Sequence, residues 1–336
     1  MRADTDRRGS TVTVRRVSAA PIVDAGAAPG YDAIFNAGAI HHDGVFHLFA
    51  RGVRDGYRRN DGRGPRFLDY ISDVLVFTSG DGRSYEFQQI LAESSHEGVH
   101  SYEDPRVQRV RSGGEERVVM TYTNVPAPVS GKPWRVGVHR LGYEDGRFFL
   151  NRTSGRVVGP EGVEDKDAVI FNLRDGRVAL IHRIHPNMQL AIFDSLDELW
   201  EPGPAYWDGH LRELDAHTII APSEGALGVG AGAPPVETED GLLLFYHERD
   251  GDGHYTTRVA LLDSETGRVV SALPEPIMRP ELEWERSGDV NNVIFVQGAV
   301  PRPDGTIYLT FGAADRCVGA ASVDAAEAVR ALRAAA

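Results

Sequence analysis

The sequence of 336 residues predicts an all-β protein, namely a five-bladed β-propeller with a short C-terminal helix. Two observations predict this fold. A similar hairpin occurs five times, at a spacing of roughly 60 to 70 residues that suits propeller blades, and helix signals are sparse. A β-sandwich is the alternative, but it does not account for five similar hairpins.

Each repeat places a tight turn between two apolar strands. Asp-Gly favours type I′ hairpin turns, which need a positive φ at both central residues. The turns are Asp43-Gly44, Gly113-Gly114, Asp175-Gly176, Asp240-Gly241 and Asp304-Gly305. The strands before them are 39–40, 107–110, 168–172, 235–237 and 298–300, and those after them are 45–50, 117–122, 177–182, 242–247 and 306–311. A third strand follows at 74–78, 135–141, 189–194, 257–263 and 318–323, so five repeats of about four strands account for most of the chain.

Two helical segments complete the predicted architecture. Residues 324–335 form the C-terminal helix, with Asp324 as N-cap and an alanine-rich body. Residues 195–200 form a single helical turn. We expect residues 13–336 to form one catalytic domain and residues 1–12 to be a flexible N-terminal segment.

Composition excludes several classes of partner and location. The formal net charge of −13 argues against binding nucleic acid or an anionic membrane through the overall field. The single cysteine, Cys317, lies in an apolar run, where we expect a buried side chain; no intrachain disulfide is possible, which fits a reducing compartment. Neither a signal peptide nor an apolar run of 18 residues is visible, so the expected location is the cytoplasm.

The first strand of each propeller blade lines the central channel, so the residues just before each hairpin are candidates for a site. They are polar or glycine-rich, as a convergent ligand pocket requires. Within Tyr102-Glu103-Asp104-Pro105-Arg106, we expect Pro105 to hold Asp104 extended at the start of a strand. A positioned carboxyl group is what a general acid needs. A solvated turn in which Arg106 pairs with either acid is the alternative.

These motifs, in order along residues 30–323, resemble the glycoside hydrolase family 130 proteins. The motifs are Asn36-Ala37-Gly38-Ala39 followed by Phe49-Ala50-Arg51, Glu103-Asp104-Pro105-Arg106, Lys166-Asp167-Ala168, Gly230-Ala231-Gly232-Ala233-Pro234-Pro235, Tyr246-His247, Gly288-Asp289-Val290-Asn291-Asn292-Val293 and Gly312-Ala313-Ala314-Asp315. The family has a five-bladed propeller fold. Most of its characterised members are inverting β-mannoside phosphorylases, and a minority are β-mannosidases.

The resemblance implies roles by position. Asp104 matches the catalytic acid, which protonates the glycosidic oxygen through a sugar hydroxyl while phosphate attacks the anomeric carbon from the opposite face. Asn36 and Asp315 match residues that hold the mannosyl unit in the −1 subsite, and we expect further substrate contacts from Glu103, Arg106, Asp167, Asn292 and Phe295. The implied phosphate-binding residues are Arg51, Arg152, Lys166, Arg183, Tyr246 and His247, although the local pattern around Arg152 departs from the family's.

The chemistry of these residues agrees with a phosphorylase. An inverting hydrolase needs two carboxyl groups, one of them activating water, whereas a phosphorylase needs one acid together with cations that position phosphate. Arg51, Lys166 and Arg183 would make a locally basic pocket in an acidic chain. The alternatives are an inverting β-mannosidase, with Glu248, Glu161 or Glu164 as the base, and a non-catalytic sugar-binding propeller, which would not need Asp104 as an acid.

We expect inorganic phosphate as co-substrate, no cofactor and no metal, since His41-His42 and His182/His185 lack a third ligand at suitable spacing. Residues 53–70 and 126–133 are the candidate loops at the acceptor subsites. Aromatic residues such as Tyr102, Trp284 and Phe295 are candidates for stacking on sugars. A homo-oligomer is possible, because relatives often assemble through terminal extensions and blade edges.

Overall fold

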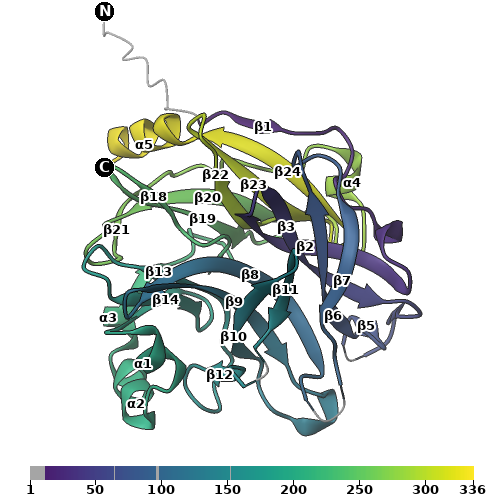
Figure 1. The fold of residues 1–336 in the computed structure, drawn as a ribbon, viewed down its shortest axis with the longest axis horizontal. Helices are drawn as coiled ribbons and strands as arrows, with labels where there is room; N and C mark the ends of the chain where they lie inside the picture. The colour runs from purple at the N-terminus through teal and green to yellow at the C-terminus, as the bar shows by residue number, and fades with distance from the viewer. Residues whose placement is uncertain (1–11, 64, 96–97, 152) are drawn as a thin grey trace, which may run out of the picture.

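The computed structural model describes residues 12–63, 65–95, 98–151 and 153–336, and in this part of the chain the strands form five antiparallel blades. Figure 1 shows the strands in colour order around the molecule. The first strands of successive blades (β2, β8, β13, β17 and β22) contact the neighbouring blades, as expected for strands around a propeller axis. The predicted five-bladed propeller is confirmed.

The blades follow the chain. The first consists of β2 (Tyr31–His42), β3 (Val45–Arg54), β6 (Ser72–Ser79) and β7 (Glu86–Ala92), and a small hairpin of β4 (Arg58–Arg59) and β5 (Phe67–Leu68) is inserted between β3 and β6. The second consists of β8 (Ser101–Ser112), β9 (Glu115–Val125), β10 (Arg135–Glu144), β11 (Arg147–Leu150) and β12 (Arg156–Val158). The third consists of β13 (Lys166–Asn172), β14 (Val178–Arg183), β15 (Met188–Phe193) and β16 (Thr218–Ile220).

The fourth blade consists of β17 (Gly228–Ala231), β18 (Val236–Thr238), β19 (Gly241–Arg249), β20 (Tyr255–Leu262) and β21 (Val269–Ala272). Its first strand is interrupted between β17 and β18, where the sequence predicted a strand starting at Pro235. Pro234 and Pro235 have no backbone N–H to donate, so they lie in the interruption. Both halves pair with β19.

The fifth blade closes the ring. It consists of β22 (Ile294–Pro301), β23 (Thr306–Ala313), β24 (Cys317–Asp324) and, as its outer strand, β1 (Val14–Arg16) from the beginning of the chain. Figure 1 shows β1 beside β24. Arg16 also forms ion pairs with Glu285 at 2.6 Å and with Glu281 at 2.8 Å. A sequence pattern read strand by strand did not predict this closure, because its two halves lie some 300 residues apart in the chain.

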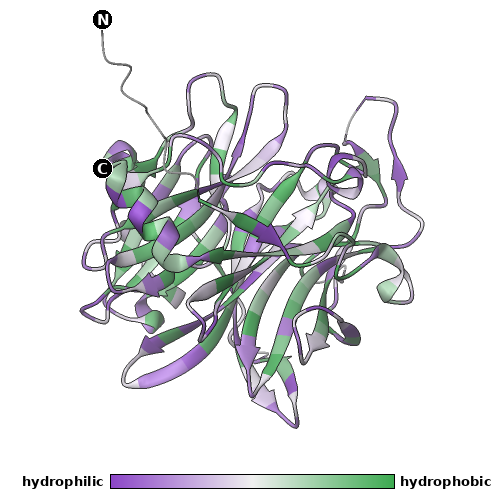
Figure 2. Ribbon diagram, turned by 90° about the horizontal axis from the view of Figure 1, so that it is seen from above, coloured by the Kyte–Doolittle hydropathy of each residue, from purple (hydrophilic) through white to green (hydrophobic). Residues whose placement is uncertain are grey.

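Hydrophobic cores lie between adjacent blades rather than at the axis. On β14, for example, Val178 and Leu180 pack toward the second blade, whereas Ala179 and Ile181 pack toward the fourth. Both faces of a blade are therefore buried, which explains why the strands read as apolar runs. Figure 2 shows hydrophobic segments along the strands and hydrophilic loops around them. Cys317 is buried as predicted, at 3% exposure.

The hairpin turns are less uniform than the Asp-Gly pattern suggested. Asp43-Gly44 and Gly113-Gly114 have positive φ at both residues, as type I′ turns require. At the other three turns only the glycine has a positive φ (Gly176, Gly241 and Gly305). Two of these connections are longer, since β13 ends at Asn172 and β22 ends at Pro301, and longer loops use other turn types.

The two predicted helical segments are present. Helix α5 (Ala325–Ala334) begins after Asp324, whose side chain accepts from the backbone N–H of Glu327, and α1 (Leu196–Trp200) begins after Ser195. Helices α2 (Pro204–Arg212), α3 (Leu214–His217) and α4 (Glu283–Arg286), and the 3-10 turns η1 (Ala25–Ala27) and η2 (Pro128–Ser130), were not predicted. The signal for α2 was Pro204 at its first position.

Residues 1–11, most of the N-terminal segment predicted to be flexible, lie outside the described residues. Among the helices of the described residues, none combines the length and hydrophobicity needed to cross a bilayer.

Candidate active site

Aspartate and asparagine side chains are presented at irregular points near the ends of the inner strands. Asn36, Asp104 and Asp167 have φ values of 48°, 54° and 52°, and each lies at a register shift in its strand. Asn292, just before β22, has a φ of 57°. A bulge leaves residues unpaired and redirects a side chain, and Asp and Asn tolerate the left-handed region better than most residues.

The expectation that Pro105 holds Asp104 extended at a strand start is therefore wrong. Asp104 is left-handed and lies inside β8, where Glu103 pairs with Thr123 and Arg106 with Thr121. Two residues of β8 thus face a single residue of β9. The bulge overrides the local preference of a residue before proline.

Asp104 is held by residues of the first blade. Asn36 Nδ2 donates to Asp104 Oδ1 at 2.8 Å, and Arg51 lies 3.6 Å from the same oxygen while pairing with Glu103. Asn36 is buried with 4% exposure and fits against Gly312, where any Cβ would overlap its side chain. Four segments distant in the sequence therefore meet around one carboxyl group.

A second carboxylate, Asp167, lies between three basic side chains. Its oxygens are 3.3 Å from Arg106, 3.1 Å from Arg183 and 3.3 Å from His247 Nε2. Burial raises the pKa of Asp167, but Arg183, His247 and Arg106 outweigh it and hold that pKa well below its usual value. Burial lowers the pKa of His247 despite the opposing effect of Asp167, so the imidazole is neutral at pH 7. Gly230 makes room for Asp167 and His247.

Arg106 acts mainly as a strut. Its guanidinium donates to the backbone oxygens of Asp104, Ala231 and Gly232 at 2.7 to 3.0 Å, and its exposure is 0%. A fully buried guanidinium with these bonds joins the second, third and fourth blades. The predicted substrate contact from Arg106 does not follow from this geometry, because its donors face protein acceptors.

Lys166 and Arg183 are neighbours, since they pair across β13 and β14. The Lys166 ammonium lies 4.2 Å from the Trp134 ring and 3.9 Å from Glu164. Burial and the nearby Arg183 lower the pKa of Lys166, whereas Asp167 and Glu103 oppose them. Arg51 and Arg183 pair with Glu103 and Asp167, and Lys166 lies beside Arg183, so basic and acidic groups alternate in this part of the site.

Asp315 and Glu103 are carboxyl groups in a crowded, buried environment. Burial raises the pKa of Asp315 to about 7; Arg51 opposes this shift, and Asp104 and Glu103 add to it. Burial likewise raises the pKa of Glu103. The surroundings of Asp315 therefore favour its protonated form.

The other predicted site residues differ in where they lie relative to Asp167. Tyr246 and His247 project to opposite faces of β19, so His247 contacts Asp167 while Tyr246 packs in the core between the third and fourth blades. Asn292 donates to His254, and Phe295 stacks 4.1 Å from the His247 ring, with the Arg106 guanidinium 5.7 Å from its centroid. Arg152 lies outside the described residues.

Two of the aromatic candidates for sugar stacking are packed within the protein. Tyr102 is buried beside Tyr122, and Trp284 stacks on Phe311.

The glutamates considered as bases are engaged by other groups or are exposed. Glu248 is 5% exposed, forms a 2.6 Å ion pair with Arg258 and accepts from the backbone N–H of Ser223. Glu161 and Glu164 are exposed, and Glu164 lies 3.9 Å from the Lys166 ammonium. Glu248 is therefore occupied by Arg258, whereas Glu164 lies beside the basic cluster.

Three aromatic residues beside the site were missed. Trp134 packs on Lys166, Tyr70 lies 5.1 Å from the Arg51 guanidinium, and Tyr255 is 5.8 Å from His247. Tyr70 and Trp134 border the two loops predicted at the acceptor subsites, which was the available signal. Tyr255 begins β20, the third strand of its blade, and nothing in its neighbourhood in the sequence marks it.

One group of potential metal ligands occurs in the described residues. Ligand atoms of Asp250, Asp252 and His254 lie within 4.8 Å of one another. Asp250 accepts from the backbone N–H groups of Asp252 and His254, so a turn accounts for their proximity. We assign no metal to this turn.

The fold and the site define a propeller enzyme in which several carboxyl groups lie among arginine and lysine side chains. A family model described as beta-1,4-mannooligosaccharide phosphorylase matches residues 7–334, and the chain belongs to glycoside hydrolase family 130. It is 27% identical over 326 residues to a 1,2-beta-oligomannan phosphorylase of Thermoanaerobacter sp. (strain X514), covering 93% of this chain and 98% of the relative.

Solved structures share the fold. A beta-1,2-mannobiose phosphorylase from Listeria innocua, in complex with beta-1,2-mannobiose, superposes with a TM-score of 0.72 at 19% identity, covering 96% of this chain and 99% of that one. A second solved structure is described in connection with glycoside hydrolases of this family that target beta-1,2 mannosidic linkages in Candida mannan. It superposes with a TM-score of 0.68 at 20% identity, covering 96% of this chain and 95% of that one.

Proposed function

We propose that this protein is an inverting β-mannoside phosphorylase that cleaves a β-mannosyl disaccharide or oligosaccharide with inorganic phosphate and releases mannose 1-phosphate. The observation that carries the proposal is the carboxyl group of Asp104, held by Asn36, next to the basic cluster of Arg51, Lys166 and Arg183. Family membership and the named phosphorylases among the relatives support the same reaction.

Asp104 serves as the acid. Its proton passes to the glycosidic oxygen through a sugar hydroxyl as the bond to the anomeric carbon breaks, and a phosphate oxygen forms the new bond from the opposite face. Hydrogenphosphate brings one proton and the leaving sugar takes one, so the proton balance closes when Asp104 is reprotonated. No second carboxylate is needed as a base.

The basic groups serve phosphate. Arg183 is already oriented by Asp167, and Lys166 supplies a compact charge on the neighbouring strand. Arg51, Lys166 and Arg183 supply positive charge that offsets the negative charge of phosphate. The mannosyl unit lies against Asn36 and Asp315.

Hydrolysis is the alternative function, since the family includes hydrolases. It requires a carboxylate that activates water opposite Asp104. Glu248 is occupied by Arg258, and Glu161 and Glu164 face solvent, so the geometry favours phosphate as the nucleophile. A non-catalytic sugar-binding propeller would not need the basic cluster.

The remaining parts of the proposal concern partners and location. The reaction needs phosphate but no cofactor, because phosphate is itself the nucleophile. We propose a cytoplasmic enzyme, in line with its single buried cysteine, that binds neither nucleic acid nor membrane, in line with its net charge of −13. We also propose that the protein forms a homo-oligomer through terminal extensions and blade edges.

The test is phosphate dependence. The protein is incubated with β-1,2- and β-1,4-mannobiose, with and without inorganic phosphate, and mannose 1-phosphate and free mannose are quantified. We expect mannose 1-phosphate only when phosphate is present, and the better disaccharide identifies the linkage. Free mannose at equal rates in both conditions would establish hydrolysis instead. The absence of product from either disaccharide would favour the non-catalytic sugar-binding propeller.

A further inference from the structure

A buried hydrogen-bonded chain lies behind Lys166 and Arg183. His182 Nδ1 lies 2.8 Å from Asp165 Oδ2, and His182 Nε2 lies 3.1 Å from His210 Nε2. Asp165 and His182 have 0% exposure and His210 has 3%. Burying a carboxylate whose side-chain partner is an imidazole is costly, so the arrangement needs a reason beyond packing.

The protonation of this chain follows from its hydrogen bonds. A carboxylate only accepts, so His182 carries its proton on Nδ1 and donates to Asp165. Burial lowers the pKa of His210 to about 3, so His210 is neutral at pH 7 and donates from Nε2 to His182 Nε2. His210 Nδ1 then carries a lone pair, and no donor to it occurs within the described residues.

The chain lies directly next to the basic cluster in sequence and in space. Asp165 precedes Lys166 and His182 precedes Arg183, while Lys166 and Arg183 pair across β13 and β14. Because successive side chains of a strand point to opposite faces, Asp165 and His182 lie on the reverse side of the two strand ends that present Lys166 and Arg183. The Asp165–His182 bond therefore ties these two ends together across the bulge between Lys166 and Val169.

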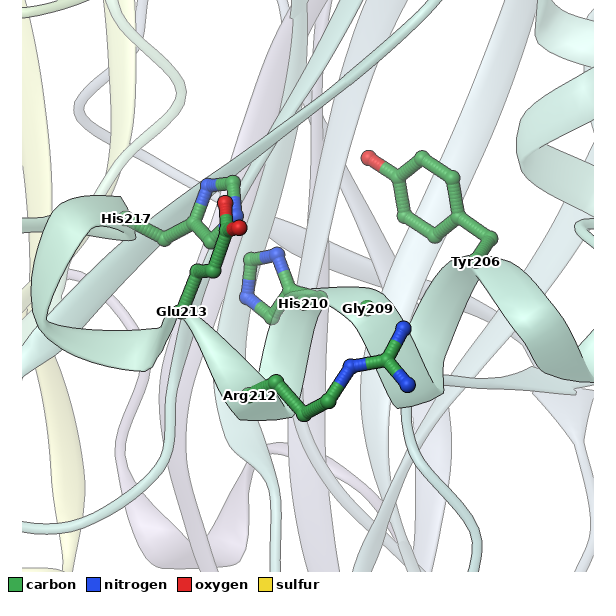
Figure 3. A pocket seen from close by; sticks show the side chains of 6 residues that line it. All are labelled: Tyr206, Gly209, His210, Arg212, Glu213 and His217. Carbon is green, nitrogen blue, oxygen red and sulfur yellow. The ribbon is translucent and has the colours of Figure 1, made fainter.

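The outer end of the chain is supported by helix α2. His210 lies on α2, which follows α1 in the chain and belongs to the connection between β15 and β16 of the third blade. Trp207, also on α2, packs edge-on against His182 at 5.6 Å. Figure 3 shows His210 between His217 and Tyr206, in a surface pocket of about 180 Å³. Tyr206 is engaged with the backbone of Ile192, and the His217 ring stacks on His210 at 4.1 Å. The pocket is the solvent side of the support, and we assign no ligand to it.

We propose that Asp165, His182 and His210 are positioning residues that fix the separation of Lys166 and Arg183 for phosphate. The inference rests on the proposed function, since it assigns the basic pair to phosphate. These three residues touch no substrate. They act by setting where two cations lie, so their loss is expected to weaken the use of phosphate more than the use of the mannoside.

The experiment compares variants by steady-state kinetics in which phosphate and mannobiose are varied separately. Asp165→Asn keeps an acceptor but removes the charge, and His182→Gln removes the donor to Asp165 while leaving an amide toward His210. We expect each to raise the KM for phosphate about tenfold and to change the KM for mannobiose less than about twofold. His217→Gln, which lies outside the hydrogen-bonded chain, is the matched control and should behave as wild type.

The double variant Asp165→Asn with His182→Gln distinguishes a unit from two separate effects. Residues that act as a unit give a double variant no worse than the more severe single variant. Thermal unfolding identifies any variant that has lost its fold. If His182→Gln does not fold, the kinetics of Asp165→Asn, the smaller change, test the inference.

Three outcomes would overturn the inference. An unchanged phosphate KM in a folded Asp165→Asn variant of a phosphate-dependent enzyme would overturn it alone, as would equal changes in both KM values. Phosphate-independent turnover by the wild type would overturn the proposed function, and this inference with it.

Discussion

The left-handed backbone recurs at the polar residues of the site. The φ values lie between 48° and 54° at Asn36, Asp104, Asp167 and Asp315. This conformation costs most L-residues about 1 to 2 kcal/mol. Such strain persists only where the surroundings hold it, and it concentrates at ligand-binding positions. The pattern supports the idea that the backbone orients these four side chains for binding a ligand. Sequence reasoning identified the residues but not their conformation, because the bulges depend on the partner strands.

Replacing Asp104 by Asn tests the acid. Asn tolerates the same left-handed backbone and can hydrogen bond to Asn36, but it has no acidic proton. We expect turnover to fall by about 10² to 10⁴, the usual contribution of general acid catalysis, with little change in the thermal unfolding midpoint. Mannobiose binding, measured calorimetrically, should persist. Turnover within tenfold of wild type would contradict the assignment.

Asp315 predicts a pH dependence of stability. Its pKa rises from an ordinary value of 3.8 to about 7 in the folded protein, chiefly through burial. The folded state therefore binds this proton more tightly than the unfolded state, so the stabilisation is complete below about pH 4 and is lost as the pH rises through 7. Asp315→Asn should become progressively more stable relative to wild type between pH 4 and pH 8.

The measurement is the unfolding midpoint of both proteins across that range. Asp61→Asn, at an exposed position of the 53–70 loop, is the control and should shift equally at all pH values. If the midpoint of Asp315→Asn minus that of wild type fell as the pH rises, the sign of the Asp315 shift would be contradicted.

Elements differ in how far the sequence defines them. The hairpins and third strands were predictable because an apolar run and a turn are local signals. The interruption between β17 and β18 was visible in Pro234-Pro235, but the strand on its far side, β17, contains two glycines and lacks the usual strand signal. Helix α2 and the ring-closing β1 depend on contacts with distant segments. For the same reason Trp134 and Tyr255 could not be recognised as neighbours of Lys166 and His247.

The alternation of β19 separates two candidates that adjoin in sequence. His247 contacts Asp167, whereas Tyr246 faces the core with Arg258 against its hydroxyl. His247→Asn should raise the phosphate KM about tenfold, since the shorter side chain no longer reaches Asp167, a loss of about 1.4 kcal/mol. Tyr246→Phe should keep phosphate kinetics within about twofold and lose about 1 kcal/mol of stability. Kinetics and denaturant unfolding distinguish these results, and the opposite ranking would place Tyr246 at the anion.

At the scale of the whole molecule, charge and fold point in different directions. The chain carries a net charge of −13, yet the blades bring Arg51, Arg106, Lys166 and Arg183 together near the axis. Each of these residues comes from an inner strand or its partner, so the propeller itself concentrates them. The sequence predicted a local basic pocket from residue types, but the number of carboxylates that share it emerges only from the fold.

Ring closure makes the last prediction. Glu285 has 0% side-chain exposure and depends on Arg16 of β1, with further bonds from the backbone of Glu281 and Leu282. Arg16→Ala leaves this carboxylate buried without its cation and should cost about 3 to 5 kcal/mol in the free energy of unfolding. Arg333→Ala, at an exposed pair between Arg333 and Asp240, should cost at most about 1 kcal/mol. Urea unfolding compares the two.

Removing both partners of the buried pair, as Arg16→Met with Glu285→Gln, should recover part of the loss because no uncompensated charge remains. A folded Arg16→Ala enzyme as stable as Arg333→Ala would mean that the backbone pairing of β1 with β24 closes the ring by itself. The inner strands carry the site and β1 is the outermost strand of its blade, so the Arg16→Ala protein should retain its phosphate KM at low temperature while losing resistance to urea. Stability and phosphate use would then be separable, because β1 and the strands that carry Arg51, Lys166 and Arg183 belong to different blades.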